Sequence, residues 1–256
     1  MSMVDRDKVI HFFKEYTSAY NPSDPKIKLK IDHTYRVAKL AETIAASTGK
    51  VKGDLAWLMG MLHDIGRFEQ IRRYNTFSDA DSIDHASLGA DILFSDSLIL
   101  KFGDFDDREL GILELSIRNH SAYRIQEGIS PEERMYCKVL RDADKIDIFR
   151  VNCDTPPEEI YNVTTKDLRT AGVSDAVKNC FFERHAVLRS LKETAIDNLV
   201  AHICLVFELE MPLSIRIAKE QGYVDKLMNF RSDNPETDEW FQYMRNNLWR
   251  MAEGNE

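Results

Sequence analysis

The sequence has few cysteines. Only four of its 256 residues are of this type, and they stand singly along the chain: Cys137, Cys153, Cys180 and Cys204. A zinc ribbon, a redox dithiol or a disulfide framework needs closely paired cysteines, so none of these is expected. We predict four reduced thiols that are mostly buried.

The sequence also lacks long apolar runs. No stretch approaches the ~20 apolar residues that a membrane-spanning helix requires. Near the start, charged residues from Asp5 to Lys8 occupy the place where a signal peptide needs an apolar segment. These features predict a cytoplasmic protein with no membrane partner.

Positive charge is in deficit as well. The chain has 34 lysines and arginines against 43 aspartates and glutamates, which gives a formal net charge of −9. A protein that follows a nucleic-acid backbone needs clustered cations, so this balance argues against such a partner. A small phosphorylated substrate needs only one or two cations and remains compatible. We interpret most of the acidic side chains as solvated helix faces.

What the sequence does contain is helical periodicity. With 43% hydrophobic residues, a chain of this length can bury a full core. The strand signal is negligible and there is no internal repeat, so an all-α fold is predicted. The polar, irregular stretch 68–81 predicts a long loop. Helices are expected near residues 4–20, 28–47, 54–64, 83–94, 106–120, 131–150, 186–208, 211–228 and 237–251.

The residues that carry chemistry are histidines and aspartates. His63 and Asp64 are adjacent at the end of an apolar helix, and Gly66 follows where the turn would break. Adjacent side chains on a helix point in different directions, so they can share a ligand only at the helix end. A metal ion fits this position, and imidazole with carboxylate suits Mn, Fe, Zn or Ni better than Ca or Cu.

Other histidines of the right type lie on neighbouring segments. His33 falls in the first turns of the helix at 28–47, and His85 falls in the first turn of the helix near 83–94. His120 lies on a stripe with Leu113 and Ile117 and is therefore expected to point inward. A single histidine on such a stripe is more often a core residue than a ligand, so the joint pattern carries the prediction. The remaining three histidines, His11, His185 and His202, are assigned to structure.

One aspartate near the end of the region completes the set. Ser130 and Pro131 form a start signal for a helix, because serine caps and proline favours the first helical position. Asp144 lies four residues after the apolar Leu140 on that helix, whereas Asp142 would face elsewhere. The helix face therefore favours Asp144 as the ligand.

Taken in order, these residues resemble a known pattern. His33, then His63 with Asp64, then Asp144 between a small and a basic residue, is similar to the HD superfamily of metal-dependent phosphohydrolases. The resemblance covers residues 26–150 and implies an HD-domain helical bundle with His33, His63, Asp64 and Asp144 as metal ligands. We expect residues 1–25 to form an N-terminal helix that packs on this core. Residues 151–256 would be a helical C-terminal extension of the same globular unit.

The number of metal ions stays open. His85 and His120 fall where two-metal members, such as the HD-GYP and cyclic-nucleotide phosphodiesterases, place additional histidine ligands. The resemblance thus implies one or two divalent ions (Mn, Fe, Zn, Ni or Mg), with Asp64 bridging the second ion to the first. The paired histidines and the Gly-Tyr-Pro stretch of HD-GYP proteins are absent, which argues against cyclic di-GMP as substrate.

Several polar neighbours could support the centre. Arg67 stands where related phosphodiesterases carry a lysine, and its guanidinium could hold two phosphate oxygens, although pairing with a carboxylate is the alternative. Lys145 is a weaker cation candidate. Asp79, Asp81 and Asp84 could accept a hydrogen bond from a ligating imidazole or simply cap a helix, and they stay unassigned.

These observations predict an HD-type phosphomonoesterase or phosphodiesterase. Its substrate would be a small phosphorylated molecule, with a nucleotide favoured, and metal-activated water would attack it. The predicted catalytic residues are Asp64, Arg67 and His120; His120 or His85 could protonate the leaving group if it binds no metal. Two alternatives stay open: a regulatory or binding module whose C-terminal helices form a homodimer or partner surface, and a di-iron HD oxygenase.

Overall fold

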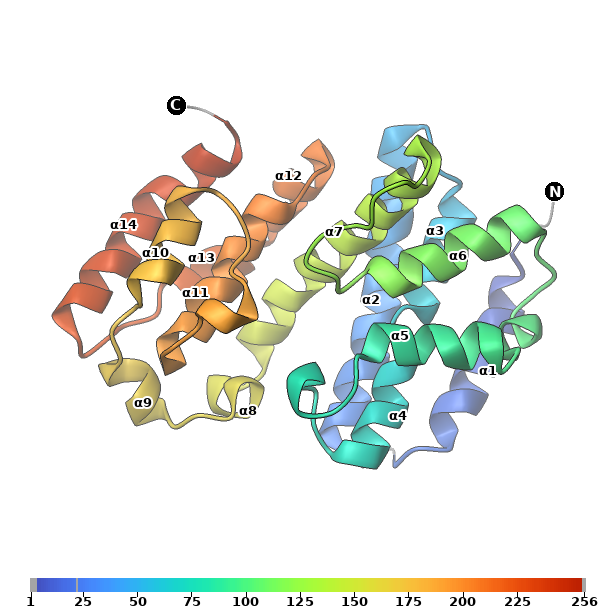
Figure 1. Ribbon diagram of the computed structural model, residues 1–256, viewed down its shortest axis with the longest axis horizontal. Coiled ribbons are helices and arrows are strands. Elements are labelled where there is room, and N and C mark those ends of the chain that lie inside the picture. The colour runs from blue at the N-terminus through green and yellow to red at the C-terminus, as the bar shows by residue number, and fades with distance from the viewer. Residues whose placement is uncertain (1–3, 22, 255–256) are drawn as a thin grey trace. The chain divides into compact units, whose positions relative to one another are not determined.

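The protein is described here from a computed structural model, which covers residues 4–21 and 23–254. Within these ranges the chain forms helices, turns and loops without any strand, so the all-α prediction is confirmed (Figure 1). None of the helices in the same ranges is long and apolar enough to cross a bilayer. The chain divides into two compact units; the first ends at Asp144 and the second begins at Lys145.

The first unit holds most of the helices that the sequence pattern predicted before residue 150. A short 3-10 helix at Asp79–Asp81, a π-helical turn at Asp91–Ser95 and a 3-10 helix at Leu98–Lys101 connect the longer elements. The α-helices are α1 (Arg6–Ser18), α2 (Pro25–Thr48), α3 (Gly53–Leu62), α4 (Ile65–Tyr74), α5 (His85–Ala90), α6 (Asp107–Asn119) and the first part of α7 (Pro131–Asp154).

Two glycines allow the helices of this unit to approach closely. A Cβ atom on Gly60 of α3 would lie 2.4 Å from the Cα of Ala38 on α2. A Cβ on Gly66 of α4 would lie 2.2 Å from the carbonyl oxygen of His85 on α5. Because real Cβ atoms do not come so near to backbone, larger residues would push these helices apart. Both contacts lie next to predicted ligands: Gly60 accepts a hydrogen bond from His63, and Gly66 contacts His85.

The prediction that Gly66 breaks the helical turn was wrong. Gly66 lies inside α4, and its small size serves the contact with α5 instead. The predicted loop at 68–81 was also too long, since α4 continues to Tyr74 and ends at Asn75, whose φ is 52°. The polar stretch is helical because Glu69 pairs with arginines three and four residues later while Phe68 is buried beneath.

Helix α1 packs on the first unit through aromatic side chains. The Phe13 ring meets the rings of Tyr35 and Phe68 edge-on, at centroid distances of 5.6 and 6.0 Å. At the start of α1, Arg6 bridges Asp54 and Glu42, each at 2.6 Å. The N-terminal helix is thus part of the first unit.

The second unit contains shorter helices around a core that includes Phe181, Phe241 and Met244. Two 3-10 turns, Arg189–Leu191 and Leu205–Glu208, flank α11. Its helices are the end of α7, α8 (Pro157–Tyr161), α9 (Thr165–Thr170), α10 (Asp175–Phe182), α11 (Ala195–Cys204), α12 (Pro212–Gln221), α13 (Tyr223–Met228) and α14 (Pro235–Ala252).

Helix boundaries in this unit differ from the prediction. The single helix expected at 186–208 begins only at Ala195, because Asp197 accepts the backbone N–H groups of Glu193 and Thr194 and so caps the start. The helix expected at 211–228 is divided by Gly222, whose φ is +70°. The boundary between the two compact units lies at residue 144, inside α7, and the bounds 26–150 of the predicted core stay a prediction. That residues 151–256 extend the same globular unit stays a prediction.

Candidate metal centre

Six buried side chains converge inside the first unit, and most of them come from the ends of helices. Ends of helices carry unpaired backbone groups and bring several chain segments to one place. His63 and His120 stand at the C-caps of α3 and α6, Asp64 is the N-cap of α4, His85 opens α5, and His33 and Asp144 lie within α2 and α7. The structure thus brings together all six predicted ligands.

One half of the cluster combines two imidazoles with two carboxylates. The Nε2 atom of His33 lies 3.1 Å from Oδ1 of Asp144 and 3.5 Å from Oδ2 of Asp64. The Nε2 atom of His63 lies 3.5 Å from the same Asp64 oxygen and 3.7 Å from the Asp144 oxygen. Four donor atoms therefore surround one small space.

The other half uses the second oxygen of Asp64. Its Oδ1 atom lies 3.5 Å from Nε2 of His85 and 3.8 Å from Nε2 of His120. These two nitrogens are 3.0 Å apart. Asp64 consequently presents one oxygen to each pair of imidazoles, which is the arrangement of a carboxylate that bridges two binding positions.

The outer nitrogens of three rings fix which atom faces the centre. Nδ1 of His63 donates to the carbonyl oxygen of Gly60 at 2.8 Å, and Nδ1 of His120 donates to that of Ile117 at 2.7 Å. Nδ1 of His85 donates to Oδ2 of Asp79 at 2.8 Å. In the neutral rings each Nε2 therefore carries a lone pair directed inward, as in metal-ligating histidines.

These lone pairs fit a cation. Nε2 of His63 is fully buried and has no hydrogen-bond partner among the described residues. The facing Nε2 atoms of His85 and His120 cannot bond to one another when both are acceptors. A nitrogen and oxygen donor set without thiolate suits a divalent transition metal, so the residues present fit such an ion.

Charge in the cluster supports the same conclusion. Burial by itself would raise the pKa of Asp64, but Lys30 and the imidazoles around it hold the pKa well below its usual range. Burial likewise opposes ionisation of Asp144, but the nearby imidazoles of His33 and His63 hold the pKa of this carboxyl well below its usual range. Burial and the Arg67 charge lower the pKa of His85 to about 4. Two ionised carboxylates and the neutral His85 imidazole thus lie together in the cluster.

Lys30 is a member of the site that the sequence interpretation missed. Its Nζ atom donates to Oδ2 of Asp64 at 2.7 Å, and its side chain is 16% exposed. Lys30 precedes His33 by three residues on the same helix, and residues at this spacing lie on one face. That spacing was the signal that could have identified it.

Arg67 is bonded to the loop that follows α4. Its Nη1 donates to Oε1 of Gln70 and to the carbonyl oxygen of Phe77, both at 2.7 Å, and to Oδ1 of Asp79 at 2.8 Å. Its Nε lies 3.7 Å from Oδ1 of Asp64. Pairing with a carboxylate, the predicted alternative, is therefore present, and the phosphate role stays a prediction.

The three loop aspartates have separate roles. Asp79 accepts a hydrogen bond from His85. Burial by itself would raise the pKa of Asp79, but His85, Arg67 and Gln70 hold it below its usual range. Asp84 caps α5 by accepting the backbone N–H of Ser87 at 2.7 Å. Asp81 is exposed. Only Asp79 orients a residue of the cluster.

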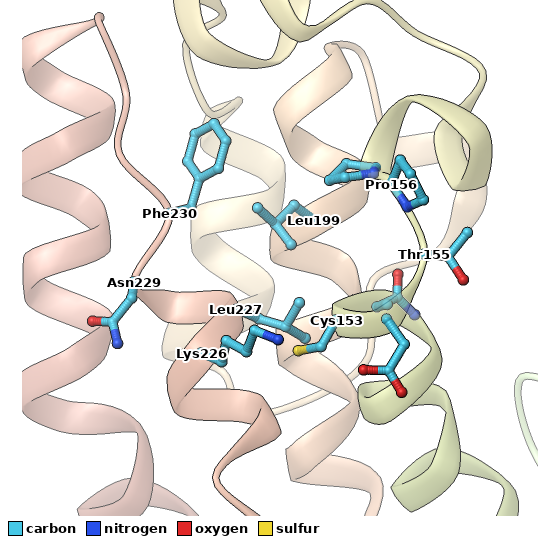
Figure 2. A pocket seen from close by; sticks show the side chains of 11 residues that line it. Cys153, Thr155, Pro156, Leu199, Lys226, Leu227, Asn229 and Phe230 are labelled. Atoms are coloured by element: carbon cyan, nitrogen blue, oxygen red, sulfur yellow. The ribbon is translucent and has the colours of Figure 1, made fainter.

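A cavity of about 450 Å³ lies elsewhere, in the second unit (Figure 2). Its lining includes Cys153, Leu227, Lys226 and Phe230. Burial raises the pKa of the Cys153 thiol to about 11, so the protonated thiol is favoured over the thiolate at neutral pH. None of the predicted site residues lines this cavity.

All four cysteines are free, and Cys137, Cys180 and Cys204 are buried, as predicted.

Comparison with known families agrees with the geometry. Residues 31–150 match the family model of the HD domain, and this stretch contains all six residues of the cluster. Residues 31–150 therefore belong to the HD-domain superfamily, whose members are generally metal-dependent hydrolases. Comparisons with curated proteins and with solved structures found no match.

Proposed function

We propose that this protein is a metal-dependent phosphohydrolase that cleaves a phosphomonoester or phosphodiester of a small molecule. A nucleotide is the favoured substrate class. The observation that carries the proposal is the position of Asp64, whose two oxygens each face a pair of buried imidazoles. This arrangement supports a centre for two ions rather than one.

In this proposal each side chain of the cluster has a separate role. Divalent ions, when bound, supply a water of lowered pKa and neutralise the charge of the phosphoryl oxygens. His33, His63 and Asp144 would hold one ion, His85 and His120 the other, and Asp64 would contact both. Asp79 keeps the His85 ring in the orientation that presents Nε2, and Arg67 keeps Asp79 in place.

The roles of two predicted catalytic residues change within this proposal. His120 donates through Nδ1 to a backbone carbonyl and presents Nε2 to Asp64, so a ligand role is supported over that of a general acid. Arg67 acts through Asp79, to which it is bonded. Asp64 keeps its predicted place.

The test combines metal content with hydrolysis. Purified protein reconstituted with Mn²⁺ should hold about two equivalents per chain and hydrolyse p-nitrophenyl or bis-p-nitrophenyl phosphate. A panel of nucleoside monophosphates, deoxynucleoside triphosphates and cyclic dinucleotides would then identify the substrate class. Asp64→Ala provides the blank, and Asp32→Ala, an exposed acid next to His33, is the matched control.

Other results would contradict the proposal. Protein that holds no transition metal and hydrolyses neither ester would favour a binding or regulatory module. Oxygen consumption by the iron-loaded protein, without ester hydrolysis, would favour an oxygenase. Hydrolysis that survives Asp64→Ala at full rate would place the activity elsewhere.

A further inference from the structure

Lys30 is placed unlike an ordinary surface lysine. Its Nζ atom lies 2.7 Å from Oδ2 of Asp64, the oxygen that also faces His33 and His63. The same atom stands 5.4 Å from the centre of the Phe77 ring. The ammonium is therefore held at the edge of the cluster by a carboxylate on one side and an aromatic face on the other.

A role as the partner of Asp64 alone does not explain this position. Removing an ammonium from water is costly, and a cation beside a centre for divalent ions adds repulsion between like charges. The arrangement becomes favourable when an anion joins the centre, because the ammonium then contributes a point charge to it. A phosphoryl group is an anion of this kind.

Arg67 is less available for the same task. Three acceptors occupy its Nη1, and they belong to α4, to the loop that follows it and to the 3-10 helix at Asp79–Asp81. Its buried Nε has no hydrogen-bond partner among the described residues and lies 3.7 Å from Oδ1 of Asp64. Among the described residues Lys30 makes a single hydrogen bond, and a flexible four-carbon stem carries its three donors. The ammonium can thus exchange Asp64 for a substrate oxygen without disturbing the loop.

We propose that Lys30 binds a phosphoryl oxygen of the substrate and is the main substrate-binding cation of the centre. This inference rests on the proposed phosphohydrolase function. It assigns to Lys30 a role that the sequence motif had suggested for Arg67.

The test separates binding of phosphate from binding of metal. Wild type, Lys30→Met and Lys30→Arg are reconstituted with Mn²⁺, and Lys28→Met, an exposed lysine of the same helix, is the control. Calorimetry measures Mn²⁺ and inorganic phosphate binding, and kinetics give kcat and KM for bis-p-nitrophenyl phosphate. Lys30→Met should keep its Mn²⁺ but bind phosphate about 10- to 100-fold more weakly and lose kcat/KM to a similar degree.

The other variants distinguish a role in phosphate binding from a structural role. Lys30→Arg should restore part of the phosphate affinity, and Lys28→Met should resemble wild type. If Lys30→Met binds phosphate as tightly as wild type does, the inference is wrong. If Lys30→Met loses Mn²⁺, a fourth variant, Lys30→Gln, replaces it, and phosphate binding by Lys30→Gln at the wild-type level shows that Lys30 is only a structural partner of Asp64 and overturns the inference. If wild type itself binds neither Mn²⁺ nor phosphate, the proposed function fails, and this inference fails with it.

Discussion

Two of the buried aspartates, Asp64 in the first unit and Asp197 in the second, differ in what surrounds them. Asp197 in the second unit is fully buried and accepts the backbone N–H groups of Ser174, Glu193 and Thr194, besides the Ser174 hydroxyl. Asp64 in the first unit is 2% exposed and is surrounded by imidazoles and by Lys30. Backbone donors mark a structural acid, whereas converging side-chain donors mark a binding site.

Two histidines, one in each unit, repeat this contrast. In the second unit, Nδ1 of His202 donates to the Tyr161 hydroxyl at 3.0 Å, and that hydroxyl donates to Asn152 at 2.8 Å. The bonds form a chain of paired donors and acceptors. In the first unit, Nε2 of His63 has carboxylates at 3.5 and 3.7 Å instead. The first arrangement stabilises a fold and the second can bind an ion.

The largest expected effect is on Asp64. Asp64→Ala should lower hydrolysis by roughly 100-fold or more and reduce bound Mn²⁺ below one equivalent per chain, because the carboxylate contacts both halves of the cluster. Metal content and initial rates measure this. An Asp64→Ala protein that still holds its full metal content would contradict the metal-binding role of Asp64, and with it the contrast to Asp197.

Asp197 should respond in the opposite way. Asp197→Ala should lower the free energy of unfolding by about 2–4 kcal/mol, because four hydrogen-bond donors lose their acceptor. Mn²⁺ content per folded chain should not change. Urea unfolding with and without Mn²⁺ measures both quantities, and a loss of metal without a loss of stability would contradict the structural role.

A smaller effect is expected at Asp79. Asp79→Asn should weaken binding of one Mn²⁺ equivalent by about 10-fold, because the His85 ring loses its charged acceptor while its ligand atom remains. The other equivalent, bound by His33, His63 and Asp144, should keep its affinity. Asp81→Asn in the same loop is the exposed control. Equal weakening of both equivalents would show that the two halves do not bind separately.

The smallest expected effect concerns pH and His202. Burial and the nearby charge of Lys192 lower the pKa of His202 from its ordinary 6.5 to about 4. Its neutral form is therefore favoured in the fold, and the stability it contributes above pH 6.5 is lost as pH falls toward 4. In urea unfolding of metal-free protein, His202→Gln should lose less stability than wild type between pH 7 and pH 5. Parallel losses in both proteins would contradict this reading.

Much of the site could be predicted because the relevant signals are local. The start at Ser130 is confirmed, since its hydroxyl accepts the backbone N–H of Glu133 at 3.2 Å. Spacing along that helix was enough to favour Asp144 over Asp142. Helix α4 was missed because its charged surface resembles a loop when the pairs of Glu69 with Arg72 and Arg73 are not known.

The sequence by itself determined the helical class, the ligand types and the order in which they occur. Only the tertiary structure decided that Asp64 turns one oxygen to His33 and the other to His85, and that Lys30 and Asp79 join them. The physical reason is the distance along the sequence over which each kind of interaction acts. Capping and helical spacing act over three or four residues, whereas the meeting of distant segments depends on how closely helices pack. That packing depends here on Gly60 and Gly66, where one added carbon atom would hold the helices apart.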